Sequence, residues 1–401
     1  MTRPKGRPMT MPLLSKAHMH SLAASYRNTL LNDVIPFWLE HAIDTEHGGI
    51  MTCLDREGRV IDTDKGVWQQ GRFAWMMGHL FNTVERRPEW LAHAGHTIRF
   101  LRGRCYDTDG RLFFHVTRDG TPIRKRRYAY AESFACIAFG EYARATGKSE
   151  YAEWAEETYA TYAGHQPSPP KFTGARTMKS MGVPMIDIVT CQCLRESIGF
   201  ADADARIDRA IEEIRRDFMK PDIRCCMESV GPQGEIIDHL DGRLLNPGHA
   251  IEGAWFIMRE GKLRGNAAYV RQGLDILDWM WERGWDAEFG GVLYYRDVYG
   301  HPVSEYWQDM KFWWPQNEAL IATLLAYQLT GDEKYAAWHR QLHDWYARHF
   351  VDAEHGDCYG YLSRDGRVTS PVKGNLFKGC FHYPRQLLTC WRLCDELRPQ
   401  P

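Results

Sequence analysis

Residues 246–256 place a titratable pair at the start of a predicted helix. Asn246 is a typical N-cap residue and Pro247 a typical first helical residue, because the cap side chain accepts an amide hydrogen bond and proline has no amide to leave unpaired. His249 then lies in the first turn, and Glu252 lies three residues further on the same face. The helix dipole disfavours an imidazolium ion there, whereas Glu252 favours it. These opposed effects predict a histidine that carries protons near neutral pH.

A second histidine, His382, stands just before another predicted helix. Two imidazoles on different helices can remove a proton from a carbon next to a carbonyl and return one to the opposite face. Arg72 would stabilise the enolate oxygen as charge develops. Glu318 and Glu252 would orient or tune the imidazoles. The predicted catalytic residues are therefore His249, His382, Arg72, Glu318 and Glu252.

Aromatic side chains accompany these polar groups, since 13% of the residues are Phe, Trp or Tyr and 15 are Trp. Aromatic faces pack against the CH surfaces of sugars, and charged groups bind sugar hydroxyls. Trp313 and Trp314 stand together before Pro315, and two adjacent large residues at a helix entrance are not both expected to face the core. The predicted substrate-binding residues on these grounds are Tyr128, Glu132, Trp313 and Trp314.

Two other kinds of function remain open on the residues alone. Glycoside hydrolysis requires two carboxyl groups about 5–5.5 or 6.5–9.5 Å apart and no histidine pair, and Glu252, Glu318, Asp309 and Glu132 could supply them. A non-catalytic binding protein would not need His382. Phosphoryl transfer, hydride transfer, nucleophile-elbow hydrolysis and zinc proteolysis each lack their motif in this sequence.

Six helix pairs must position these residues, and in the third pair a Pro-rich loop at 166–171 takes the place of a hairpin-like loop. The more charged first helices are predicted at residues 16–43, 90–101, 151–162, 203–218, 267–280 and 335–350. The more apolar second helices are predicted at 67–81, 128–145, 184–198, 247–259, 315–329 and 384–397. Hairpins are expected at 47–59, 107–122, 225–237, 290–303 and 359–368.

Four of the second helices start at a proline, and these prolines are 63, 68 and 69 residues apart. The repeat and the apolar second helices predict an all-α, (α/α)6 barrel with the second helices inside and short β-hairpins in the loops at one end. We expect one catalytic domain over 1–401, with a loose leader at 1–14. The aligned inner helices would gather the polar residues at one mouth.

Composition limits the partners and the compartment. The formal net charge of −2 gives no electrostatic footprint for nucleic acid or an anionic membrane, so a small neutral or mildly charged partner is expected. With the aromatic and charged residues above, the expected partner is a small-molecule sugar. The 11 cysteines form no zinc-binding pattern, and we expect no metal. No signal peptide or 18-residue apolar run is apparent, and a cytoplasmic, reducing location is expected.

The sequence resembles the N-acylglucosamine 2-epimerase family from about residue 37 to residue 397. The resemblance rests on five motifs: WQQGRFAW with Arg72, GHAIEGAWF with His249, KFWWPQNEALIA with Glu318, GYLSRDGRV at 360–368 and KGNLFKGCFHYPR with His382. It implies an (α/α)6 barrel in which two histidines act as acid and base at C2 of an open-chain sugar. It also implies that Arg72 and Glu318 are essential to that chemistry.

The same motifs point to a subgroup. Cellobiose-type epimerases have, as a pattern, a further histidine on the third inner helix and a tryptophan five residues before the last histidine, where this chain has Met185 and Phe377. FKGCFHYPR is most similar to the N-acylglucosamine 2-epimerases, which adds Phe377 to the expected substrate-binding residues. The resemblance implies interconversion of N-acyl-D-glucosamine and N-acyl-D-mannosamine, with an aldose-ketose isomerase or aldose 2-epimerase as the alternative.

The subgroup also implies a nucleotide that activates without reacting. No cofactor is then required for the chemistry, and ATP is expected, at most, as an allosteric activator. Residues 373–379, which contain two lysines and two glycines, are a candidate part of that nucleotide site. A homodimer is expected.

Overall fold

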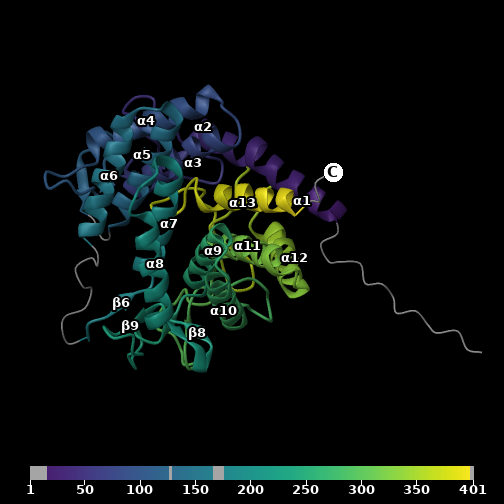
Figure 1. Ribbon diagram of the computed structural model, residues 1–401. Coiled ribbons are helices and arrows are strands. Elements are labelled where there is room, and N and C mark those ends of the chain that lie inside the picture. Colours follow the sequence, from purple (N-terminus) through teal and green to yellow (C-terminus); the bar gives the residue numbers. More distant parts are fainter. Residues whose placement is uncertain (1–15, 126–128, 166–175, 398–401) are drawn as a thin grey trace, which may run out of the picture.

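The computed structural model describes residues 16–125, 129–165 and 176–397. In it the helices form two concentric rings, an outer one and an inner one (Figure 1). The outer ring consists of α1 (Lys16–Thr29) with a π-helical turn (Leu30–Val34) and α2 (Ile35–His41), α4 (Pro88–Arg104), α6 (Ser149–Gly164), α8 (Ala203–Glu213) with a π-helical turn (Ile214–Phe218), α10 (Ala267–Gly284) and α12 (Glu333–His349). The inner ring consists of α3 (Val67–Thr83), α5 (Tyr130–Thr146), α7 (Gly182–Ile198), α9 (Pro247–Arg264), α11 (Trp313–Thr330) and α13 (His382–Glu396).

Each inner helix packs against the next one along the chain, from α3 to α13. The ring closes where Phe381, just before α13, meets the Trp75 ring of α3 at a centroid distance of 5.4 Å. Arg392 of α13 also donates a hydrogen bond to the Thr83 carbonyl at the end of α3. The predicted all-α (α/α)6 barrel is confirmed.

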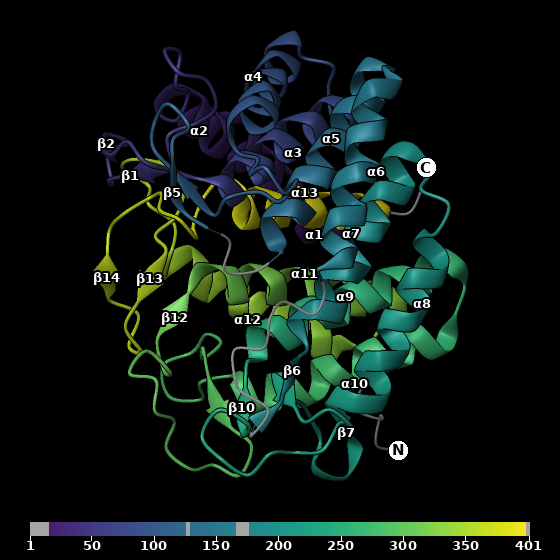
Figure 2. The ribbon, with the colours of Figure 1, turned by 90° about the vertical axis from the view of Figure 1, so that its left-hand side faces the viewer.

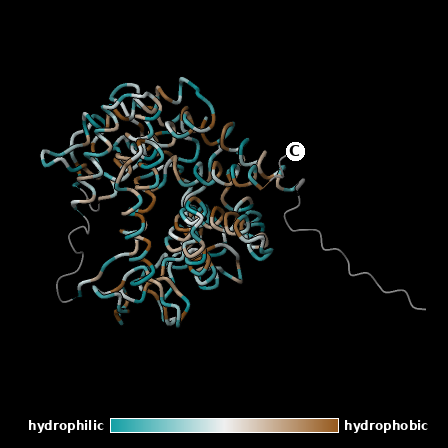
Figure 3. Tube along the Cα trace, in the orientation of Figure 1, coloured by the Kyte–Doolittle hydropathy of each residue, from teal (hydrophilic) through white to brown (hydrophobic). Residues whose placement is uncertain are grey.

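Burial follows the difference between the apolar second helices and the charged first helices. Every residue of α11 from Trp313 to Ala326 is buried, whereas α12 buries one face only. In Figure 3 the trace over the inner helix α7 is largely brown, and the loops at the periphery are largely teal. The helices that are apolar on all sides therefore form the inner ring, where every face is buried. None of the helices within the described ranges is long and apolar enough to cross a membrane.

The two ends of the barrel differ in their connections. Where inner helices run into outer ones, the loops are tight and four helices end at a glycine in the left-handed conformation, which glycine adopts without a Cβ clash: Gly147, Gly199, Gly265 and Gly331. Outer helices reach the next inner helix through long loops that carry the short strands (Figure 2). The strands therefore lie at the end where the inner helices begin.

These strands form six small antiparallel sheets in the described part of the chain. They are β1 (Cys53–Leu54) with β2 (Val60–Asp62); β3 (Lys65–Gly66), β4 (His115–Val116) and β5 (Pro122–Arg124); β6 (Lys179–Ser180) with β9 (Ser229–Val230); β7 (Met219–Lys220) with β8 (Cys225–Cys226); β10 (Leu244–Leu245) with β11 (Arg296–Asp297); and β12 (Lys311–Phe312), β13 (Tyr361–Leu362) and β14 (Val368–Ser370).

Two predicted hairpins are wrong in their pairing. The strands within 225–237 pair with residues 219–220 and 179–180, and the strand within 290–303 pairs with residues 244–245. Strands of two residues have few hydrogen bonds to hold a hairpin of their own. β9 and β11 pair with a neighbouring loop of the ring, whereas β8 pairs with β7 just before it in the same loop. The expected loose leader at 1–14, the start of an inner helix at 128 and the Pro-rich loop at 166–171 lie outside the described residues.

A buried lysine–aspartate pair that an arginine completes occurs three times between these loops. Lys65 bonds Asp44 at 2.7 Å, Lys311 bonds Asp286 at 2.9 Å and Lys373 bonds Asp352 at 2.9 Å, with all six side chains no more than 2% exposed. An arginine completes each pair: Arg118, Arg364 and Arg56. Burial opposes ionisation of these aspartates, but the bonds from arginine and lysine outweigh it and hold each pKa well below its ordinary value.

Replacing Asp286 with asparagine tests one of these pairs. We expect the free energy of unfolding at pH 7 to fall by about 3–5 kcal/mol, because Lys311 keeps its charge in a buried site and loses its partner. A carboxylate with a lowered folded pKa stabilises the protein above about pH 4 and loses that effect as the pH falls below it. The wild type should therefore lose more stability than D286N between pH 4 and 2, as measured by urea unfolding.

The matched control is Asp238→Asn. Asp238 pairs with Arg243 on the surface and its side chain is 79% exposed, so we expect a change of about 1 kcal/mol or less. Equal losses in the two variants would show that the buried pair contributes no more than a surface one.

Candidate active site

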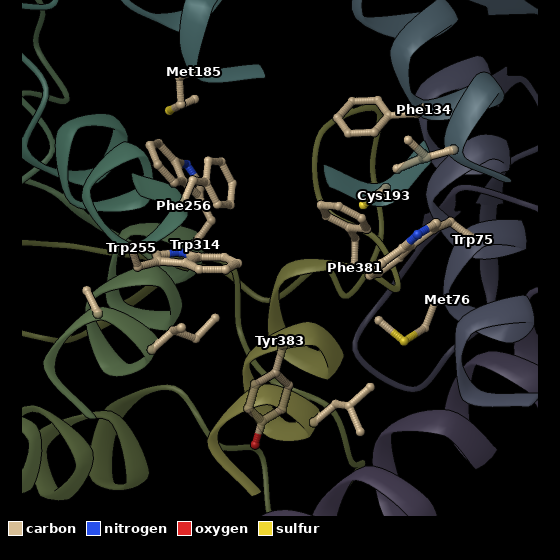
Figure 4. Packing of buried hydrophobic residues seen from close by; sticks show 14 of the residues in the cluster. Trp75, Met76, Phe134, Met185, Cys193, Trp255, Phe256, Trp314, Phe381 and Tyr383 are labelled. Atoms are coloured by element: carbon tan, nitrogen blue, oxygen red, sulfur yellow. The ribbon is translucent and has the colours of Figure 1, made fainter. Parts of the chain in front are cut away.

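A cavity of about 980 Å³ runs along the barrel axis. All six inner helices contribute side chains to it from their first turns, and the long loops supply the rim. Figure 4 shows Trp255 and Trp314 on one side of this region and Phe134, Phe381 and Trp75 on the other. The polar residues described next lie among these aromatic rings.

His249 lies in the first turn of α9, as predicted. Asn246 caps the helix by accepting a hydrogen bond from the His249 amide at 3.1 Å, and Pro247 is the first helical residue. The imidazole Nδ1 faces both carboxylate oxygens of Glu228 at 3.1 Å. Burial opposes protonation, but the charge and hydrogen bond of Glu228, with a smaller effect of Glu252, raise the pKa of His249 above its ordinary value.

His382 is the first residue of α13, and the ring of Trp314 contacts the imidazoles of both His249 and His382, at centroid distances of 4.8 Å and 5.9 Å. Nδ1 of His382 lies 2.7 Å from Oε1 of Glu318. Burial and the nearby charges of Arg72 and Arg385 hold the pKa of His382 well below its ordinary value, although Glu252 opposes them. The two histidines thus have opposite tendencies toward protonation.

Arg385 links two carboxylates, those of Glu252 and Glu318, next to His382. Its Nη2 donates to Glu252 at 2.5 Å and to Glu318 at 2.7 Å, and all three side chains are buried. Glu252, Glu318 and His382 have ligand atoms within 4.8 Å of one another. Because Arg385 already supplies the positive charge between the two carboxylates, we assign this cluster as an ion-pair network and assign it no metal.

Arg72 enters the cavity from α3 with little compensation for its charge. Nη1 donates to the Phe377 carbonyl at 3.2 Å, and the guanidinium lies 4.2 Å from the Phe134 ring centroid and 4.8 Å from that of Phe381. Its Nε has no partner within the described residues. Burial lowers the pKa of Arg72 to about 9, although Glu252 opposes the shift. The charge is therefore held ready for an anionic ligand atom.

Three predicted aromatic residues line the cavity: Trp313, Trp314 and Phe377. Trp313 and Trp314 are both buried, whereas Phe377 is 46% exposed at the rim. The Trp314 ring packs directly against the backbone of Gly248. A Cβ at residue 248 would lie only 2.8 Å from this ring and from Pro315, so a larger residue would displace Trp314.

Replacing Gly248 with alanine should displace Trp314 from its contact with both histidines. We expect kcat/KM to fall about 10²-fold, since small misplacements at a catalytic site have costs of this size, and Tm to fall as well. A Cβ at Gly103 in α4 meets nothing within 4 Å, so Gly103→Ala should retain activity and slightly raise Tm. Steady-state kinetics and thermal melting of the two variants check this; equal behaviour would contradict it.

Some predicted residues are placed differently. Glu132, predicted to bind substrate, does not reach the cavity. It is fully buried outside it, where it accepts hydrogen bonds from Arg111 at 2.7 Å and from the Leu112 amide at 3.1 Å. The cavity face of α5 carries residues 130, 133, 134, 137 and 141, and residue 132 points away from it by helical geometry. Tyr128 lies outside the described residues.

The two lysines of residues 373–379, expected to form part of a nucleotide site, are both engaged in ion pairs. Lys373 pairs with Asp352, and Lys378 donates to Asp357 at 2.7 Å and to the Lys373 carbonyl. Both side chains are at most 1% exposed. They hold the loops together and are not free to bind a phosphate.

Sequence reasoning missed Glu228 and Arg385. Arg385 had a local signal, because it lies three residues after His382 and hence on the same helical face. Glu228 had none, since it lies between β8 and β9 and reaches His249 only through the pairing of loops. Glu252 shares the cavity with His249 as predicted, but Glu228 makes the hydrogen bond that orients this imidazole.

Fold and site together define an (α/α)6 barrel whose central cavity holds two histidines, each bonded to a carboxylate. Residues 48–379 match the family model described as N-acylglucosamine 2-epimerase (GlcNAc 2-epimerase). The chain belongs to the N-acylglucosamine 2-epimerase family, and its relatives are carbohydrate epimerases.

Curated relatives cover nearly the whole chain. It is 36% identical to N-acylglucosamine 2-epimerase of Bos taurus, over 92% of this chain and 89% of that protein, and 34% identical to the Homo sapiens enzyme, over 92% and 90%. Among solved structures, cellobiose 2-epimerase from Spirochaeta thermophila superposes with a TM-score of 0.82 at 21% identity, covering 97% of this chain and 100% of that one. That likeness shows the shared fold.

Proposed function

We propose that this protein interconverts N-acyl-D-glucosamine and N-acyl-D-mannosamine by moving a proton at C2 of the open-chain sugar. The relatives from Bos taurus and Homo sapiens, which match 92% of this chain, are named N-acylglucosamine 2-epimerase. The observation that carries the proposal is the pair His249 and His382, which lie against the same Trp314 ring with a separate carboxylate on each Nδ1.

The proposed mechanism uses the ring nitrogen that each carboxylate leaves free. With Nδ1 engaged, Nε2 of one histidine removes the C2 proton, and electron density moves to the C1 oxygen. The Arg72 guanidinium stabilises the resulting enolate oxygen. Nε2–H of the other histidine then returns a proton to the opposite face of C2, which inverts that carbon. Glu318 holds His382 in the tautomer with Nδ1–H, so that the Nε2 lone pair faces the substrate.

Glycoside hydrolysis finds little support in the same cavity. Glu252 and Glu318 share Arg385 between them, so neither carboxylate is free to act as a nucleophile or a general acid. Glu132 is turned away, and Asp309 is not among the residues that line the cavity. The pocket therefore favours proton transfer at carbon.

The test is proton NMR of N-acetylmannosamine, and separately of mannose, incubated with the enzyme in heavy water. We expect deuterium at C2 and the appearance of N-acetylglucosamine. Exchange with mannose alone, with fructose formed, would show an aldose-ketose isomerase. No exchange with either sugar would overturn the proposal.

We propose further that side chains of this chain supply the acid, the base and the cation, so that no cofactor takes part in the chemistry. The resemblance to the family supports ATP as an activator only, and the NMR experiment is run with and without it. The proposed location is cytoplasmic, supported by 11 cysteines of which none is in a disulfide. The proposed assembly is a homodimer, which sedimentation of the purified protein tests.

A further inference from the structure

We propose that Glu228 is a positioning residue that makes His249 the proton donor of the resting enzyme and leaves His382 as the resting base. This inference rests on the proposed function and deepens it, since it assigns different starting roles to the two histidines.

The two carboxylate–imidazole pairs differ in how their negative charge is shared. Both oxygens of Glu228 lie 3.1 Å from Nδ1 of His249. Glu318 instead divides its charge among three donors, because it bonds Nδ1 of His382 at 2.7 Å, Arg385 at 2.7 Å and the indole Nε1 of Trp255 at 2.7 Å. Glu228 is therefore the stronger partner for an imidazolium ion.

The surroundings of the two rings differ in the same sense. His249 meets Glu228 from the β8–β9 loop, Glu252 from its own helix and the neutral ring of Trp314 from α11. Tyr294 lies close to this group as well, against Trp314 and within range of the Glu228 charge.

His382 meets two cations, Arg72 and Arg385, together with Glu318 and Glu252. Its side chain is 9% exposed, whereas that of His249 is 32% exposed. Burial beside two arginines favours the neutral form of His382. For His249 the carboxylate of Glu228 outweighs the opposing effect of burial and favours the charged form.

The backbone of Glu228 is pinned on both sides. Its carbonyl accepts a hydrogen bond from the Met181 amide at 3.0 Å, next to the β6–β9 pair, and its amide donates to the Leu244 carbonyl at 3.2 Å. The side chain is 17% exposed. The carboxylate is thereby held in place from the starts of two inner helices, α7 and α9.

In the proposed cycle the two Nε2 atoms, one on each histidine, carry one proton between them. In the resting state His249 carries protons on both nitrogens and His382 carries one on Nδ1. Nε2 of His382 takes the C2 proton and Nε2–H of His249 gives one back, so the pair ends with the opposite protonation. Return to the resting state requires that His382 release a proton to solvent and His249 regain one.

The experiment compares wild type, Glu228→Gln and the control Glu235→Gln, which changes an exposed carboxylate shortly after β9. Histidine signals are titrated by NMR in the substrate-free protein, with His249 assigned through its loss in H249N. We expect E228Q to move the His249 midpoint about one pH unit lower, equal to a tenfold change in the protonation equilibrium. E235Q should leave it unchanged.

Activity provides the second readout. Above the wild-type midpoint, kcat/KM of E228Q should be about tenfold below wild type, and the two should converge as the pH is lowered below the E228Q midpoint. A midpoint unchanged in E228Q, or an activity loss equal at every pH, would overturn the inference. If wild type neither epimerises nor exchanges either N-acyl sugar, the proposed function fails, whereas the titration still tests the pairing by itself.

Discussion

Replacing His382 with asparagine is expected to lower kcat/KM for C2 epimerisation by about 10³-fold or more. The imidazole is the group that removes or returns the C2 proton on its side of the sugar, and general acid–base catalysis contributes up to about 10⁴-fold. Asparagine still offers an amide donor to Glu318, which otherwise loses its 2.7 Å bond to Nδ1. The loss should therefore appear in kinetics and not in folding.

The measurement combines initial rates with deuterium incorporation at C2, followed from each epimer. His165→Asn is the control, since this exposed histidine ends α6 away from the cavity. Thermal melting of H382N should stay within a few degrees of wild type. Retention of activity within tenfold of wild type would remove His382 from the mechanism.

Replacing Arg385 with methionine is expected to lower the free energy of unfolding by about 3–5 kcal/mol, because two buried carboxylates are left without their shared cation. Glu252 and Glu318 lie within 4.8 Å of each other and of His382, so their mutual repulsion would favour uptake of a proton by one of them. We also expect kcat to fall by about 10²-fold or more, since Glu318 would no longer be fixed against His382.

A double-mutant cycle separates the two effects. Glu252→Gln in the R385M background removes one of the uncompensated charges, and should recover part of the stability but little of the activity. Urea unfolding and steady-state kinetics of the single and double variants give both quantities. Additive losses of stability would show that the ion pair between Arg385 and Glu252 is not coupled as its 2.5 Å distance indicates.

These variants also distinguish the roles of the cavity's charges. H382N removes a group that contacts the reacting carbon in the proposed mechanism, whereas R385M acts through the carboxylates that hold it. E228Q changes only the pH at which His249 is charged. Three different readouts, namely rate, stability and pH dependence, therefore report on three neighbouring parts of one site.

The sequence by itself determined the helical repeat and the residues that begin each inner helix. Apolar spacing, the proline starts and the Asn246 cap depend on neighbours a few residues away, so they can be read without knowing the fold. The inner position of the second helices followed from their apolar character. Because aligned inner helices bring their first turns together, Arg72, His249, Trp314, Glu318 and His382 could be predicted to converge, and all but Glu318 line the cavity while Glu318 bonds His382 directly beneath it.

Only the tertiary structure decided which groups pair inside the cavity. Arg385 and Glu252 are 133 residues apart, and Glu228 reaches His249 through strands that pair between repeats and not within their own loop. Glu132 was misassigned because a shift of one or two positions around a helix turns a side chain away from the axis. Such choices depend on the rotation of each helix and on the path of long loops, which long-range packing sets and local sequence does not.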